Sequence, residues 1–237
     1  MPPATGPGGA AQPDATPDKR TAVILAGGHS TRFGDEDKAV AELAGTPMIR
    51  RVVDRLSPVV DEFIINCRDD QVPVIDDALT ADAGDSDSAG EQPVSFAVDP
   101  VPDRGPMAGI MTGLRAAQTE FAVVVACDMP FVDPELVSAL FDRAASADAD
   151  AAVPRLEDEW FQTTQAVYRT EPMGEACERA VDRGDRRVVE PLFDLDYVVV
   201  ETDEIRDYTD LETFENVNTR EEFEAACERL ADSSSQG

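Results

Sequence analysis

Lysine is nearly absent from this sequence, although it is normally one of the commonest residues. The 237-residue chain has two lysines and eighteen arginines. Lys19 belongs to an N-terminal segment rich in Pro, Gly and Ala, which has the composition of a flexible tail. Lys38 is therefore the one lysine expected in the folded part, and its neighbours decide whether that position is significant.

Histidine and cysteine are also scarce, which excludes several kinds of site. The single histidine is His29, and the four cysteines are far apart with no C-x-x-C pair. A structural zinc site is therefore not expected, and nothing in the spacing demands disulfides. No apolar run approaches the roughly 18 residues of a membrane span, and no signal-peptide pattern is present. We expect a cytoplasmic protein.

Positive charge is in deficit, because 49 acidic residues face 20 basic ones and give a net charge of -29. Such a surface repels nucleic acids and anionic membranes, so neither is expected as a partner. The acidic residues are scattered among well-formed apolar segments, which indicates a folded protein rather than a disordered one. We interpret the charge as adaptation to high salt, where a Debye length of roughly 3 Å at 1 M screens self-repulsion.

The chain divides into two tails and one folded region. Composition predicts disordered tails at residues 1–20 and 232–237, a single domain over 21–231, and a flexible acidic loop at 80–92. Within the domain, apolar segments of strand length alternate with segments of helical spacing. Strands are predicted at 21–26, 61–67, 94–99 and 121–128, and helices at 46–59, 105–118, 133–146 and 220–231.

This alternation predicts an α/β fold with a mostly parallel central sheet covered on both faces. Asp133 before Pro134 suits a helix start, and Thr219 with Glu222 forms a capping box for the last helix. The segments 150–156, 162–169 and 197–203 are less regular. Ligands of open α/β sheets bind at the carboxyl ends of the strands, and Asp128 ends the predicted strand at 121–128.

The stretch VILAGGHSTRFGDEDKA, residues 23–39, follows the first strand. It is not a P-loop, because Asp35 follows Gly34, and it is not a G-x-G-x-x-G loop, because Gly27 and Gly28 are adjacent. A glycine pair still lets backbone N–H groups approach an anion, and Arg32 and Lys38 add two cations nearby. Glycine content alone would equally fit a plain turn with solvated charges.

The spacing in LAGGHSTRFGDEDKA resembles the nucleotidyltransferase signature L-A-G-G-x-x-x-R-x-G-x-x-x-K. More narrowly, the chain is similar to the molybdenum cofactor guanylyltransferases, from about Thr21 to Leu230. The further matching motifs, in order, are INCR, VDPVPDRGPMAGIMTGL, VVACDMPFV, GDRRVVEPLF and FENVNTREEF. The resemblance implies a three-layer α/β/α, Rossmann-like nucleotidyltransferase fold and the transfer of GMP from GTP to molybdopterin.

The same resemblance implies the site residues. Lys38, Arg32 and Asp128 would be catalytic, Asp128 would hold Mg²⁺ with a possible contribution from Asn218, and Arg186, Arg187 and Asn216 would meet the acceptor. GTP would be bound by Leu25, Ala26, Gly27, Lys38, Asn66, Asp99 and Asp128. The chemistry is compatible: an ammonium is a compact phosphate ligand, and Mg²⁺ is often held by one or two carboxylates plus substrate phosphates. A carboxylate at Asp99 suits the two donors on the guanine edge.

Several alternatives remain open at this point. The acceptor or base could differ, as in a cobinamide-phosphate guanylyltransferase, a molybdopterin cytidylyltransferase or a sugar-phosphate nucleotidyltransferase. The chain could also be a non-catalytic nucleotide-binding assembly factor, and molybdoenzymes or their chaperones are possible partners. Trp160 and Phe161 could line an acceptor pocket or pack in the core. Asp35, Glu36 and Asp37 place negative charge beside the expected phosphate loop, which is electrostatically unfavourable unless they are solvated or paired.

Overall fold

The computed structural model describes residues 19–28, 37–81, 92–100, 105–185 and 187–234. Its centre is a seven-stranded sheet with strand order β5-β4-β1-β6-β8-β7-β9. Within the described residues, only β8 runs antiparallel to its neighbours in this sheet, so the prediction of a mostly parallel sheet is confirmed. The strands are β1 (Arg20–Leu25), β4 (Glu62–Cys67), β5 (Val94–Val98), β6 (Phe121–Ala126), β7 (Ala151–Arg155), β8 (Gln165–Arg169) and β9 (Tyr197–Glu201).

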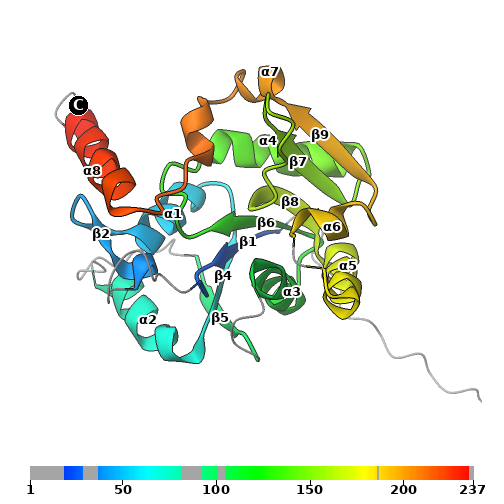
Figure 1. Cartoon of the computed structure of the whole chain (residues 1–237), viewed down its shortest axis with the longest axis horizontal. Coiled ribbons are helices and arrows are strands. Elements are labelled where there is room, and N and C mark those ends of the chain that lie inside the picture. Colours follow the sequence, from blue (N-terminus) through cyan, green and yellow to red (C-terminus); the bar gives the residue numbers. More distant parts are fainter. Residues whose placement is uncertain (1–18, 29–36, 82–91, 101–104, 186, 235–237) are drawn as a thin grey trace, which may run out of the picture.

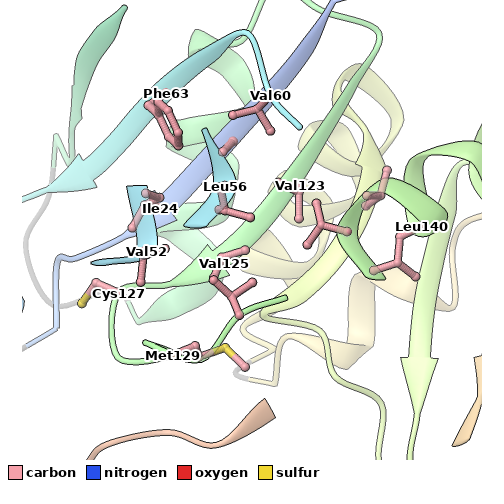
Figure 2. Packing of buried hydrophobic residues seen from close by; sticks show 14 of the residues in the cluster. Ile24, Val52, Leu56, Val60, Phe63, Val123, Val125, Cys127, Met129 and Leu140 are labelled. Carbon is pink, nitrogen blue, oxygen red and sulfur yellow. The ribbon is translucent and has the colours of Figure 1, made fainter. Parts of the chain in front are cut away.

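The central strands are apolar on both sides because both sides are covered. In β1, Ala22 and Ile24 face one core cluster and Val23 faces the other, and all three side chains are fully buried. This two-faced burial explains the nearly continuous apolar run of the strand. Figure 2 shows Ile24 beside Val52 and Leu56 in the first of these clusters.

Helices cover the two faces as separate layers (Figure 1). The first face carries α1 (Met48–Leu56), α2 (Val72–Thr80), α4 (Pro134–Ser146) and α7 (Thr202–Ile205). The second carries α3 (Pro106–Ala116), α5 (Thr170–Arg183) and α6 (Val189–Leu192). The three-layer α/β/α prediction is therefore confirmed. Among the described connections are the 3₁₀ turns η1 (Lys38–Val40), η2 (Asp69–Gln71) and η3 (Leu211–Phe214).

The C-terminal helix α8 (Arg220–Ser234) packs away from the main sheet, beside a short hairpin of β2 (Glu42–Leu43) and β3 (Thr46–Pro47) (Figure 1). A third apolar cluster joins them: Leu43, Met48, Val217 and Ala226. The predicted capping box is present, because Glu222 Oε2 accepts from Thr219 N at 2.8 Å and Thr219 Oγ1 accepts from Glu222 N at 3.2 Å. This box fixes where α8 begins.

The boundaries differ from the expected ones at several places. Strand β1 begins at Arg20, inside the segment expected to be a tail, and α8 continues to Ser234, past the expected end of order at 231. Residue 80 of the expected acidic loop ends α2, while 82–91 lie outside the described residues. No helix in the described ranges has the length and apolarity that crossing a membrane requires.

Candidate functional site

The carboxyl ends of β1 and β6 meet where the order of the sheet reverses. From β1 the chain continues to β4 and β5 on one side, whereas β6 lies on the other side of β1. Cys127 N, just past β6, donates to Leu25 O at the end of β1 at 3.0 Å. Ligands of open α/β sheets bind at such a reversal, so the segments that follow Leu25 and Cys127 flank the expected binding position.

A charged cluster stands at this position. Lys38 Nζ donates to Asp128 Oδ2 at 2.6 Å and to Asn218 Oδ1 at 2.9 Å. The Lys38 and Asp128 side chains are 12% and 20% exposed, so both are shielded but still reachable. We call Lys38, Asp128 and Asn218 the lysine cluster. It joins three predicted site residues that lie up to 180 positions apart in the sequence.

Local structure holds each member of the lysine cluster in place. Asp37 caps η1 by accepting from Ala39 N at 3.0 Å, which fixes the backbone at Lys38. Val217 N donates to Asp128 O at 2.9 Å and so brings the next residue, Asn218, to the same place. The N–H groups of Asn218 and Thr219 hold the pKa of the Glu222 carboxyl below its usual value, so this end of α8 stays anchored at neutral pH.

The donor set at Asp128 fits a magnesium ion. Among the described residues, Asp128 Oδ1 is a buried oxygen with no hydrogen-bond partner. A buried carboxylate oxygen without a partner is costly, and a cation would satisfy it. The described residues contain no group of three or more His, Cys, Asp or Glu that could hold a metal without help. Mg²⁺ is often held by one or two protein oxygens plus substrate phosphates, and the donors at Asp128 are compatible with that arrangement.

A second group of residues lies on the other side of β1, and we call Gly27, Asn66 and Asp99 the Asp99 cluster. Asn66, at the end of β4, is 2% exposed, and its Nδ2 donates to Ala97 O at 3.0 Å and Asp99 Oδ1 at 2.9 Å. A Cβ added to Gly27 would lie 3.2 Å from Asp99 Oδ2, so this carboxylate lies directly against the first loop. Both amide hydrogens of Asn66 therefore have protein acceptors, and its visible effect is to orient Asp99.

Helix α3 supports this cluster through a close approach at Gly109. A Cβ at this position would lie 2.3 Å from Asn66 Oδ1, closer than real Cβ contacts come. Gly109 belongs to the GPMAGI motif. The motif's second glycine thus makes room for the buried Asn66 beneath the Asp99 cluster.

Two of the remaining predicted residues, Arg187 and Asn216, are described, and neither joins the lysine cluster or the Asp99 cluster. Arg32 and Arg186 lie outside the described residues, as does His29. Arg187 has a side chain that is 75% exposed and pairs with Glu190. Asn216 is exposed and lines a hollow of about 570 Å³ together with the carboxylates of Glu215, Glu222 and Glu228. Within the described residues, neither Arg187 nor Asn216 shows a contact with Lys38 or Asp128.

The two aromatic residues of the β7–β8 connection, Trp160 and Phe161, have different surroundings. Trp160 is 71% exposed, so core packing is wrong for this side chain. Phe161 is half-buried and meets Tyr197 edge to face, with ring centroids 5.9 Å apart. Phe161 therefore packs against β9, while Trp160 faces solvent.

Two residues near the loop have contacts that sequence reasoning did not anticipate. Arg68, the last residue of the INCR motif, donates to Gly27 O and Gly28 O at 3.2 Å each. Gln71, 1% exposed, donates to Ala26 O at 2.9 Å. The sequence does contain one indication of the Arg68 contacts. Arg68 is a long cation directly after a buried strand, at the sheet edge where the first loop also begins.

Comparison with known proteins agrees with this geometry. A family model described as the MobA-like NTP transferase domain matches residues 22–207. Several relatives bear the name "Probable molybdenum cofactor guanylyltransferase". The one from Natronomonas pharaonis is 52% identical over 213 residues, 90% of this chain and 99% of the relative. The one from Methanosarcina mazei is 37% identical over 212 residues, 86% of this chain and 88% of the relative.

A solved structure is also similar: molybdopterin-guanine dinucleotide biosynthesis protein A from Archaeoglobus fulgidus. It is 27% identical to this chain, with a TM-score of 0.71, and the match covers 90% of this chain and 99% of that one. The family match contains Lys38, Asp99 and Asp128, whereas Asn218 lies beyond its end.

Proposed function

This chain belongs to the MobA-like NTP transferase family, and from that premise we propose that it is a molybdenum cofactor guanylyltransferase. In the proposed reaction the terminal phosphate of molybdopterin attacks the α-phosphorus of GTP. The products are molybdopterin guanine dinucleotide and pyrophosphate. The observation that carries the proposal is the lysine cluster. In it, Lys38 Nζ lies 2.6 Å from Asp128 Oδ2, beside the point where the strand order of the sheet reverses. The names of the relatives supply the acceptor.

We place the nucleotide along the carboxyl ends of β5, β4, β1 and β6. Asp99 and Asp128 follow β5 and β6, which are separated by three strand spacings, or roughly 14 Å. That span suits an extended nucleotide, with the base near Asp99 and the phosphates near Lys38. The Asp99 carboxylate can accept from guanine N1–H and its amino group, while cytosine offers no matching pair of donors. In this assignment Asn66 orients Asp99, and the backbone of Leu25, Ala26 and Gly27 lines the nucleotide.

The metal belongs beside the phosphates. Asp128, with Asn218, would hold Mg²⁺, and the ion would offset charge on the phosphates during transfer. In this assignment Lys38 places a positive charge at the phosphates, and the backbone of residues 25–27, which follows β1, orients them. Arg32 stays a predicted second cation. Positioning and charge stabilisation of this kind are the main contributions a protein makes to phosphoryl-type transfers.

No general base is required in this mechanism, because the attacking phosphate is already ionised at neutral pH. The scarcity of histidine is consistent with that chemistry. We further propose that residues 21–231 act as one domain, since α8 packs on the hairpin beside Lys38 and delivers Asn218 to the lysine cluster. Predicted partners, such as molybdoenzymes, and the cytoplasmic location stay predictions.

The decisive experiment is pyrophosphate release from GTP in high salt, with and without molybdopterin and Mg²⁺. Pyrophosphate release that requires GTP, molybdopterin and Mg²⁺ together supports the proposal. Release with CTP but not GTP would overturn the base assignment and keep the reaction class. Release with cobinamide phosphate or a sugar phosphate in place of molybdopterin would overturn the acceptor. GTP binding without any transfer would indicate the assembly-factor alternative.

A further inference from the structure

Three side chains outside the lysine and Asp99 clusters tie the two ends of the signature loop together. Asp37, Arg68 and Gln71 form one hydrogen-bonded unit, which we call the loop clasp. Gln71 Nε2 donates to Asp37 Oδ2 at 2.5 Å, and Arg68 Nη2 lies 3.5 Å from the same oxygen. Gln71 Oε1 accepts from Arg68 N at 2.9 Å, which locks the unit to the start of η2.

The loop clasp holds the beginning of the loop by its carbonyl oxygens. Gln71 Nε2 donates a hydrogen bond to Ala26 O, and Arg68 Nη1 donates to Gly27 O and Gly28 O. In a trans peptide the C=O of one residue and the N–H of the next point in opposite directions. Drawing Ala26 O and Gly27 O toward the clasp therefore turns the N–H groups of Gly27 and Gly28 away from it. In the described part of the chain, neither N–H has an acceptor.

The loop clasp also holds the end of the loop, directly before Lys38. Asp37 Oδ2 is bound by the clasp, while its Oδ1 caps η1 through Ala39 N. The same carboxylate thus connects the glycine segment to the backbone that presents Lys38. Its negative charge is offset by Arg68, and both side chains are only 18% exposed. The unfavourable position of Asp37 beside a phosphate loop is thereby resolved by pairing.

We infer that Asp37, Arg68 and Gln71 are positioning residues for the triphosphate of the nucleotide. They turn carbonyl oxygens, which repel phosphate, away from the ligand and expose N–H groups instead, and they fix Lys38 relative to those groups. This inference rests on the proposed function, because it assumes that the loop binds a nucleoside triphosphate. None of the three touches the reacting atoms, so none is a catalytic residue.

The test measures GTP affinity in the presence of Mg²⁺ and the absence of acceptor, for Gln71→Ala, Arg68→Lys and Asp37→Asn. Each variant is expected to raise the Kd for GTP by about tenfold, the effect of losing hydrogen bonds to a charged or loop-forming group. Arg68→Lys is informative because it keeps the charge but loses the planar guanidinium, whose Nη1 donates to both carbonyls while Nη2 lies near Asp37. In turnover, KM for GTP should rise while KM for the acceptor stays unchanged.

Two matched controls separate positioning from general stability. Gln92→Ala removes a glutamine bond to Ser57 O of 2.7 Å, and Arg55→Lys removes an arginine bond to Val132 O of 2.7 Å. Neither residue has a described hydrogen bond to residues 26–28 or 37, the described ends of the loop, so both controls should keep the GTP affinity of the unaltered protein. The double variant Asp37→Asn/Gln71→Ala should have about the same Kd for GTP as the single variant with the higher Kd, because the two residues act as one unit.

The outcomes are distinguishable. If the unaltered protein binds GTP and the clasp variants bind it equally well while melting at lower temperature, the clasp only supports the fold and the inference is wrong. Additive losses in the double variant would also contradict it. If the unaltered protein does not bind GTP, the proposed function fails instead, whatever the variants do.

Discussion

At the scale of single residues, the proposed reaction assigns roles to the charge of Lys38 and to Asp128, whose Oδ1 has no hydrogen-bond partner among the described residues. Replacing either with alanine removes one preorganised charge at the phosphates, and we expect kcat to fall by on the order of 10²-fold. The double variant should lose little more than the worse single one, because the two act as a pair. Initial rates of pyrophosphate release give the measurement.

A matched control for these variants is Arg220→Ala, which removes an exposed cation that pairs with Glu224 on α8. Its rate should equal that of the unaltered protein. Near-normal turnover in Lys38→Ala or Asp128→Ala would contradict the assignment of the lysine cluster.

The residue scale also shows the limit of what sequence patterns can predict. The family resemblance predicts Lys38, Asp128 and Asn218 as site residues, and the structure brings these three side chains together. The partners of Asp37 were not predicted, because a hydrogen bond to Gln71 depends on how two segments 34 positions apart fold onto the same sheet edge. Periodicity reports burial along one segment and carries no information about such pairs. Asp37 therefore looked like an unpaired charge in the sequence.

At the scale of elements, α3 is held against the sheet by two glycines one turn apart. A Cβ at Gly113 would lie 2.3 Å from Val23 Cγ1, and one at Gly109 would lie 2.3 Å from Asn66 Oδ1. Alanine normally stabilises a helix relative to glycine by up to about 1 kcal/mol. Here the clash should outweigh that gain, and we expect each Gly→Ala variant to lower the free energy of unfolding by roughly 1–3 kcal/mol.

The two glycine variants should differ in function. Gly109→Ala displaces Asn66, which orients Asp99, so GTP affinity should fall along with stability. Gly113→Ala meets only an apolar side chain of β1 and should leave GTP affinity near normal in the folded protein. Urea unfolding and GTP titration of the two variants check this difference, and equal GTP affinity in both would contradict the role of Gly109.

Elements themselves were predictable where the apolar pattern was strong. The strands at β1, β4, β5 and β6 carry long apolar runs, and their prediction is confirmed within a few residues. Helices α2 and α5 are not among the predicted elements; their sequences are VPVIDDALT and TEPMGEACERAVDR. Acidic residues occupy exposed positions of these helices, and the buried residues still recur at helical spacing, as with Ile75 and Leu79 in α2 and Met173, Cys177 and Ala180 in α5.

At the scale of the whole molecule, buried thiols predict how stability depends on pH. Burial raises the pKa of Cys67 and of Cys177 to about 12, and it also raises the pKa of Cys127 and of Tyr168. In the unfolded chain a thiol ionises near a pKa of about 8.5. Above that pH the unfolded state binds fewer protons than the folded state, so the free energy of unfolding falls as pH rises. Stability from these groups is fully present below about pH 8.

Each fully shifted thiol should cost about 2 kcal/mol of stability at roughly pH 10. Urea unfolding between about pH 7.5 and 10, at constant high salt, measures the slope. Cys177→Ala should flatten the slope, because it removes one of the thiols whose pKa is raised by burial. A slope that is the same in Cys177→Ala and in the unaltered protein would contradict the prediction.

The net charge of -29 sets the other whole-molecule property, the dependence on salt. At about 0.1 M salt the Debye length is roughly 10 Å, so neighbouring surface carboxylates repel one another, whereas at 1 M it is roughly 3 Å. The unfolded chain spaces these charges farther apart, which makes repulsion a cost of the folded state. We therefore expect the thermal midpoint of unfolding to rise with KCl across this range. We also expect added KCl to weaken GTP binding less than it does in a protein without this excess of acidic residues.

Charge neutralisation separates screening from other salt effects. Asp76 and Asp77 on α2 and Glu221 and Glu228 on α8 are exposed, and none has a described ion-pair partner. Changing all four to Asn or Gln should raise the midpoint at low salt and reduce its increase with KCl, while Arg220→Gln should do the opposite. Because both variants alter exposed side chains and differ in the sign of the charge removed, a common response would show that the salt dependence does not arise from charge repulsion.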